Sequence, residues 1–382
     1  MYKILNRRAA IRLLSVLLFL LVGLVGIVSF LVPSAYPVQN SLRSADEPEE
    51  DYIKWIDFNV PYSALKKTMA LDITSHRETK EMPYDWIKIL AYLASKYGNN
   101  FSLYKGKDVD ELVARLEEGE TMEAVTEKMQ HYEHYVECYT AILGGFLGDF
   151  AVQEPNESGV VRWTQNYGLR VFSPIADGYW FSHFDDFGNG RSYGYKRRHL
   201  GHDLMASVGT PIIAVETGIV EELGWNRYGG WRVGIRSLDG RRYYYYAHMR
   251  QKHPYHLSLK IGNRVMAGDV IGYMGRTGYS TKEGTNNVTQ NHLHWGLEII
   301  FHPAQKDGYH QIWIDLYPIT RLLHEYNKSE TLKNEETKDY NRVYRFRIEE
   351  EPSWRLPPRD DASSGGKAAG PSEATEKPDG YE

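Results

Sequence analysis

The sequence predicts a multidomain chain: an N-terminal transmembrane helix, a small all-α module, a mainly antiparallel β domain and a disordered C-terminal tail. Three observations predict it. A long apolar stretch follows a basic start, apolar residues at helical spacing come next, and strand-like runs separated by glycines fill the second half. The expected segments are a basic cytoplasmic segment (1–12), the membrane anchor (13–32), a linker (33–51), the helical module (52–152), the β domain (153–325) and a charged, low-complexity tail (326–382).

The composition is that of a globular protein with sizeable cores. Of 382 residues, 42% are hydrophobic and 25% are charged. The net charge of −5 is mild, which argues against nucleic acid as a partner. The single cysteine, Cys138, cannot form an internal disulfide. In a helical segment it is expected to be a small buried hydrophobic residue.

The apolar stretch from Leu13 to Val32 has the length of a membrane-spanning helix, because a helix of that length rises roughly 30 Å. Basic residues precede it and acidic residues follow it, so the rest of the chain is expected outside the cytoplasm. The alternative is a cleaved signal peptide, whose apolar core is usually only about 7–15 residues long. The protein is therefore expected to be a single-pass protein of the cell membrane, or secreted if this segment is removed.

The helical module is predicted from three capped apolar patterns. Pro83 suits the first turn of one helix, and Gly98 ends it. Asp108 caps a second, short helix, and Thr121 caps a longer third one that a glycine pair at 144–145 stops. The longer pattern also carries two histidines.

These two histidines, His131 and His134, are three residues apart and would share one helix face. The metalloprotease helix requires two histidines at a spacing of four. The pair is therefore interpreted as exposed helix histidines and not as a metal site.

The β domain is predicted from short apolar runs between glycine-containing turns. The strands are expected at Pro211–Val215, Arg232–Ile235, Arg241–His248, Val270–Met274 and His292–Ile300. Three motifs lie in or beside these runs: His199-Leu200-Gly201-His202-Asp203, Tyr246-Ala247-His248-Met249 and His292-Leu293-His294-Trp295.

The three motifs indicate a metal-dependent hydrolase. His292 and His294 point to one face, because alternate residues of a strand do so. His199 and Asp203 share a face if their segment is extended, and the intervening glycine lets the backbone bend around an ion. By the same alternation His248 is expected to line the cleft together with Tyr244 and Tyr246. A catalytic zinc site typically has three ligands from histidine and carboxylate, which this set supplies. The other histidines, including 202, 253, 256 and 302, are expected to be structural or on the surface.

On these motifs the chain resembles the LytM/lysostaphin-like zinc metallopeptidases, whose β fold is called the duplicated hybrid motif. The resemblance runs from about Gly168 to Leu322 and includes a glycine-rich run from Gly268 to Thr281. Three departures stand out. Ten residues, Lys282–Asn291, separate that run from the last motif, where many members have only a few. Trp295 replaces the commoner phenylalanine or tyrosine, and Gly296 stands where many members have glutamate.

The resemblance implies a role for each motif residue. His199, Asp203 and His294 would bind one zinc ion per chain. His248 and His292 would flank the attacking water as general base and transition-state stabiliser, in an order that the sequence leaves open. A tyrosine upstream of the first ligand supports the transition state in some members, and the candidates here are Tyr193 and Tyr195.

The expected function is a zinc-dependent endopeptidase that hydrolyses peptide bonds of peptidoglycan outside the cytoplasm. Its expected partners are peptidoglycan peptides and, through the N-terminal helix, the membrane; no nucleic acid is expected, and no protein partner is indicated. One alternative is a non-catalytic module that binds the wall or activates another hydrolase. Another is a docking piece of a division or sporulation assembly. The basic residues before the first ligand (Arg191, Lys196, Arg197 and Arg198) would attract carboxylates of wall peptides, or belong to a solvated loop.

Overall fold

The computed structural model describes residues 52–155, 158–192, 196–306, 308 and 310–356. All of them belong to one compact unit of the chain. The predicted membrane anchor at 13–32, the linker and residues 357–382 lie outside the described residues. Within the described ranges, no helix combines the length and the apolar character needed to cross a bilayer.

The helical module contains α2 (Tyr62–Arg77), α3 (Trp86–Tyr97), a 3-10 turn (Phe101–Leu103), α4 (Gly106–Glu117), α5 (Met122–Thr126) and α6 (Tyr132–Leu143). Helix α3 forms where the sequence predicts it, but it begins at Trp86, so Pro83 lies before the helix and not in its first turn. The Asp85 side chain accepts hydrogen bonds from the first-turn amides, and Gly98 ends the helix with a left-handed φ of 57°. Cys138 is buried, and His131 and His134 are exposed, as expected.

The module differs from the sequence prediction in further ways. Asp108 does not cap α4, because the N-cap is Lys105 and Asp108 lies within the first turn. The long helix expected from Thr121 is broken into α5 and α6, and His131 at the break has a left-handed φ of 62° that no continuous helix allows. Helix α2 was not predicted, because buried polar residues interrupt its apolar pattern. Asp72 is one of them: it accepts hydrogen bonds from the Trp86 amide at 2.9 Å and the Tyr167 hydroxyl at 2.8 Å.

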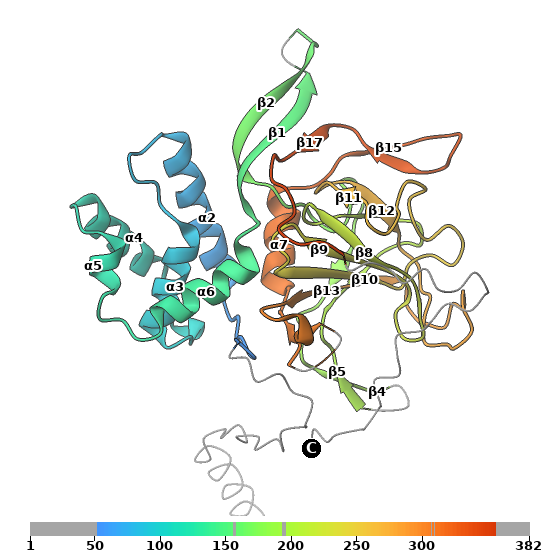
Figure 1. The fold of residues 1–382 in the computed structure, drawn as a ribbon, viewed down its shortest axis with the longest axis horizontal. Helices are drawn as coiled ribbons and strands as arrows, with labels where there is room; N and C mark the ends of the chain where they lie inside the picture. The colour runs from blue at the N-terminus through green and yellow to red at the C-terminus, as the bar shows by residue number, and fades with distance from the viewer. Residues whose placement is uncertain (1–51, 156–157, 193–195, 307, 309, 357–382) are drawn as a thin grey trace, which may run out of the picture. The chain divides into compact units, whose positions relative to one another are not determined.

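The β domain is built on one antiparallel sheet of eight strands, in the order β11-β8-β9-β10-β13-β6-β3, with β14 beside β13 (Figure 1). Its strands are β3 (Ser182–His183), β6 (His202–Met205), β8 (Gly218–Asn226), β9 (Gly230–Ser237), β10 (Arg242–Ala247), β11 (Arg264–Val265), β13 (His292–Ile299) and β14 (Ile312–Trp313). Strands β7 (Pro211–Ile213) and β12 (Val270–Tyr273) pair separately, as do β4 (Gly190–Ser192) and β5 (Lys196–Arg198). All five predicted strand runs are confirmed.

The register of three strands brings the three histidine motifs together. His294 on β13 lies opposite Ala247 on β10 and opposite Asp203 on β6. Leu293 and Trp295 on the other face of β13 are fully buried. The residues that face away from the core are thus gathered on one side of the sheet, as strand alternation requires.

The C-terminal region adds structure that the sequence did not predict. Helix α7 (Tyr317–Tyr326) packs against α2 through an ion pair of Lys66 with Glu325. Strands β15 (Thr331–Lys333) and β16 (Tyr340–Arg342) form a hairpin, and β17 (Arg345–Arg347) extends the long hairpin of β1 (Leu147–Pro155) and β2 (Val161–Leu169) to three strands (Figure 1). The expected tail from residue 326 is therefore folded as far as β17. Strands of three residues are too short to show a period of two in the sequence.

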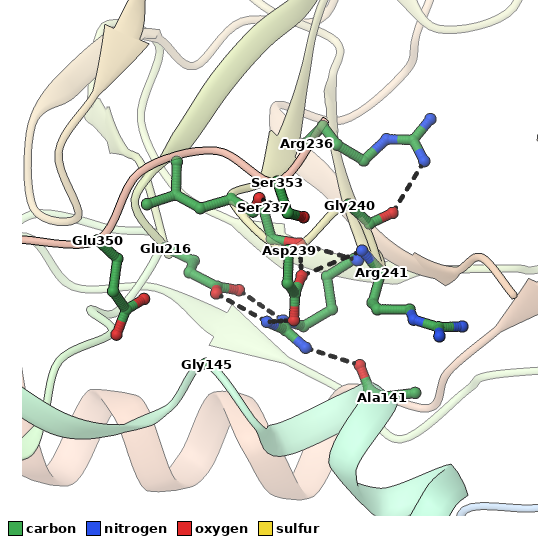
Figure 2. A network of polar contacts seen from close by, with 12 residues as sticks. Ala141, Gly145, Glu216, Arg236, Ser237, Asp239, Gly240, Arg241, Glu350 and Ser353 are labelled. Atoms are coloured by element: carbon green, nitrogen blue, oxygen red, sulfur yellow. Dashed lines mark hydrogen bonds and ion pairs between the residues drawn. The ribbon is translucent and has the colours of Figure 1, made fainter. Parts of the chain in front are cut away.

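A buried ionic network joins the helical module to the main sheet. Arg242 at the start of β10 donates to the Ala141 carbonyl of α6 at 2.9 Å. The same guanidinium contacts Glu216 at 2.8 and 3.1 Å and Asp239 at 2.7 Å. Figure 2 shows Glu216, Asp239 and Ala141 around this network. Gly145 leaves room for it, because a Cβ there would lie 1.9 Å from a Glu216 oxygen.

Candidate active site

The three predicted ligands meet at one point of the sheet. His199 follows β5, Asp203 lies on β6 and His294 on β13. His199 Nε2 and His294 Nδ1 lie 3.0 and 2.8 Å from the same Asp203 oxygen, and 3.1 Å from each other. One ligand atom from each residue therefore lies within 4.8 Å of the others, an arrangement that can hold a metal ion.

Gly201 allows the first motif to approach the last. A Cβ at Gly201 would lie 2.4 Å from His294 Cε1 and 2.6 Å from its Nε2. Its φ is not left-handed, so the position requires a glycine for space and not for an unusual backbone conformation. Glycine is therefore needed here to avoid a clash with His294, and not to bend the backbone around an ion as the sequence suggested.

A second carboxylate, which the sequence reasoning did not identify, orients the first ligand. Asp186 lies 3.0 Å from His199 Nδ1, so an N–H at that atom donates to the carboxylate and directs Nε2 toward the proposed ion position. Arg191 holds both acids: it lies 2.5 Å from Asp186 and 2.8 Å from the second oxygen of Asp203. No spacing in the sequence marks Asp186, because it lies 13 residues before His199 in a turn.

His248 and His292 lie beside this cluster, and His292 Nε2 is 3.7 Å from the Asp203 oxygen that His199 and His294 contact more closely. His248 Nδ1 donates to the Thr277 carbonyl at 2.8 Å, and His292 Nδ1 donates to the Gln290 carbonyl at 3.0 Å. Because a carbonyl only accepts, the proton of each neutral ring is fixed on Nδ1 and the lone pair on Nε2. The two ring centroids are 4.7 Å apart, and His248 is 6.1 Å from His294.

The expectation that Tyr244 and Tyr246 line the cleft with His248 is wrong. Both tyrosines are fully buried in the core: the Tyr244 hydroxyl donates to Glu216 at 2.7 Å, and the Tyr246 hydroxyl accepts from the Val215 amide at 3.0 Å. Tyr245 lines the cleft instead. His248 joins it because its left-handed φ of 60° breaks the strand alternation immediately after β10.

The buried cluster has the charge state of a cation site. Burial lowers the pKa of His294, and burial together with the neighbouring imidazoles of His292 and His294 lowers the pKa of His248 well below its usual range. Burial alone would raise the pKa of Asp203, but the contacts of His199 and His294 hold it far below its usual range. His248 and His294 are therefore neutral near pH 7 while Asp203 is ionised, and these are the forms that bind metals.

A comparison with known protein families decides what kind of domain this is. Residues 197–306 match the model of Peptidase family M23. The matched range contains Asp203 and the histidines 199, 248, 292 and 294, and Asp186 lies before it. The chain carries an M23 peptidase domain.

Curated relatives agree with this assignment. The L-Ala--D-Glu endopeptidase of Bacillus subtilis (strain 168) is 36% identical over 147 residues, which are 38% of this chain and 41% of that protein. Lysostaphin of Staphylococcus simulans is 38% identical over 84 residues, which are 22% of this chain and 16% of that protein. The chain thus spans less than half of these relatives. A solved structure of lytM from Ruminococcus gnavus ATCC 29149 is 24% identical, with a TM-score of 0.45, over 70% of this chain and 96% of that one.

The M23 domain has a cavity of about 450 Å³ over the site. The expected groove loop, Lys282–Asn291, supplies part of its wall through residues 287–290. Trp295 is fully buried and does not line the cavity. The Trp313 ring packs against Gly296, where a Cβ would lie 2.6 Å from a ring atom. Tyr193 and Tyr195 lie outside the described residues.

The remaining predicted structural histidines agree with that expectation where their contacts are described. His202 is buried and lies 2.8 Å from a ring nitrogen of His183. His253 contacts the buried Asp339 at 2.5 Å, and His302 caps the 3-10 turn Pro303–Gln305. None of the three lines the cavity.

Proposed function

We propose that this chain is a zinc-dependent endopeptidase that hydrolyses peptide bonds of peptidoglycan outside the cytoplasm. One observation carries the proposal: three ligand atoms of the type that zinc prefers lie within 4.8 Å of one another, with two further histidines beside them. The M23 domain and the endopeptidase names of its relatives support it.

The residues fit a zinc ion by their chemistry. His199 Nε2, His294 Nδ1 and one Asp203 oxygen are a two-histidine, one-carboxylate donor set, and Asp186 orients His199 from behind, as carboxylates commonly do in zinc sites. When bound, zinc would polarise the scissile carbonyl and lower the pKa of the attacking water.

His248 and His292 would handle the proton. Because both rings hold their proton on Nδ1, both first present Nε2 as an acceptor. The histidine that takes the proton of the attacking water then carries an N–H at Nε2. That N–H can donate to the developing oxyanion or to the departing amine. The depressed pKa of His248 keeps it neutral, and so ready to accept, near pH 7.

The test is a digest of defined muropeptides by the purified full chain, read by mass spectrometry. We expect two fragments whose masses add up to the mass of the substrate plus one water. These products should disappear after zinc is removed by a chelator. A zinc-loaded protein that cuts no wall peptide would refute the endopeptidase function. That result would favour the non-catalytic wall-binding or hydrolase-activating alternative.

We further propose that Leu13–Val32 anchors the chain in the membrane, with the M23 domain on the outer side. The length of the stretch and the basic residues before it support this topology. Sequencing the N-terminus of the mature protein tests it. A mature start near Ala35 would mean a cleaved signal peptide and a secreted protein.

A further inference from the structure

The charged side chains on the cavity wall are unevenly paired. Four charged residues other than histidine line it: Asp186, Arg191, Arg197 and Asp203. Arg191 forms ion pairs with both acids, and both acids also contact His199. Within the described part of the chain, Arg197 has no carboxylate within ion-pair distance, and its buried Nε has no hydrogen-bond partner. The two arginines and the two aspartates sum to zero, but Arg197 is the one of these four groups that forms no ion pair within the described residues.

Arg197 is fixed close to the proposed catalytic histidine. Its guanidinium carbon lies 5.1 Å from the centroid of the Tyr279 ring. Tyr279 in turn stacks on His248 at 5.8 Å and an interplanar angle of 27°. One aromatic ring thus separates the guanidinium from His248. A cation above the face of a tyrosine is attracted by the ring but keeps its N–H donors available for another partner.

Tyr279 is held rigidly in this position. Its φ of 48° is left-handed, which is unfavourable for a residue with a large side chain. The amide of Tyr279 donates to the Tyr228 carbonyl at 3.2 Å, and its carbonyl accepts from the Asn287 side chain at 2.8 Å. Tyr228 and Asn287 both line the cavity. A strained conformation maintained in this way is typical of a functional position.

We propose that Arg197 binds a carboxylate of the substrate and makes the enzyme selective for acidic peptides. Arg197 lines the cavity without an ion-pair partner, and a substrate carboxylate there would accept charge-assisted hydrogen bonds from the exposed N–H groups of its guanidinium. This inference rests on the proposed peptidase function and names its substrate class. The preferred peptide carries a free carboxylate within a few residues of the scissile bond. Bridges made only of glycine lack such a group.

The experiment compares two synthetic wall peptides that differ only in one side group, a free carboxylate against its carboxamide. Their dissociation constants are measured by calorimetry with the zinc-loaded full chain carrying His292→Ala, so that the peptide is not consumed. Hydrolysis rates are measured in parallel with His292 intact. Each measurement is made with Arg197 present, with Arg197→Gln and with Arg197→Lys. The matched control is Arg198→Gln, which makes the same change at an adjacent exposed residue that does not line the cavity.

We expect the carboxylate peptide to bind at least about tenfold more tightly than the amide when Arg197 is present. Arg197→Gln should remove this preference by weakening only the carboxylate peptide. Arg197→Lys should retain part of it, and Arg198→Gln all of it. Equal binding of the two peptides with Arg197 present, or a preference that survives Arg197→Gln, would overturn the proposal. A preference that depends on Arg197 but is accompanied by no hydrolysis would support this site and refute the peptidase function.

Discussion

Replacing Gly201 with alanine should disable the proposed zinc site by displacing His294. The new Cβ would lie 2.4 Å from Cε1 and 2.6 Å from Nε2 of the His294 ring, and 3.0 Å from the Trp295 carbonyl oxygen. Ordinary carbon contacts are about 3.5–4.0 Å, so the ring or the backbone must move by roughly 1 Å. Zinc–ligand distances tolerate about 0.2 Å. The displacement therefore exceeds the tolerance about fivefold, and zinc affinity should fall by at least about a hundredfold.

The assay is a zinc dissociation constant from competition with a chelator, together with the free energy of unfolding of the zinc-free protein. Overpacking should lower that free energy by about 1–3 kcal/mol. The control is Gly190→Ala: a Cβ at Gly190 has no atom within 4 Å and its φ is not left-handed, so both quantities should stay unchanged. A folded Gly201→Ala protein that binds zinc within about threefold of the parent would refute the steric argument.

Three further predictions concern the site and its support. His294→Ala should lose bound zinc, whereas His248→Ala and His292→Ala should keep most of their zinc and lose turnover by on the order of a hundredfold. Metal content and hydrolysis rates are measured for each variant, and loss of zinc from His248→Ala or His292→Ala would make the replaced histidine a ligand. Asp186→Asn should weaken zinc binding by about tenfold or more through misorientation of the first ligand, measured by chelator competition; unchanged affinity would exclude that role. Arg242→Met should lower the free energy of unfolding by about 3–5 kcal/mol, measured by urea denaturation, because it leaves a buried carboxylate unpaired; a loss below about 1 kcal/mol would show that this carboxylate finds another partner.

The sequence predicted that His199, Asp203 and His294 lie together, because strand alternation is a local rule; that they bind a metal stays a prediction. The His292–His294 pair and the runs that became β10 and β13 follow from side-chain alternation alone, and the antiparallel register then brings Asp203 opposite His294. Cys138 and the exposed pair at 131 and 134 also followed from local pattern.

The parts that the sequence did not predict depend on single backbone angles or on contacts distant in the chain. The left-handed φ of His248 breaks the alternation after β10, so His248 joins Tyr245 at the cavity and not Tyr244 and Tyr246, whose face the alternation predicted for it. Asp186 reaches His199 through tertiary structure and leaves no periodic signal. Helix α2 buries Asp72 against groups from α3 and β2. The cost of burying this carboxylate is offset by hydrogen-bond partners that are distant in the sequence, so the local pattern does not reveal them.

The bond from Arg242 to the Ala141 carbonyl has a consequence for how this protein can be divided. The residue that carries it lies on β10, the strand that pairs directly with β13 and its histidines. The hydrophobic core is also continuous from the helices into the sheet. Trimming the chain to its M23 stretch would therefore cut through a shared hydrophobic core and remove the Ala141 carbonyl that accepts from the buried Arg242, on the strand next to β13. The helices therefore form part of the scaffold that supports the M23 domain.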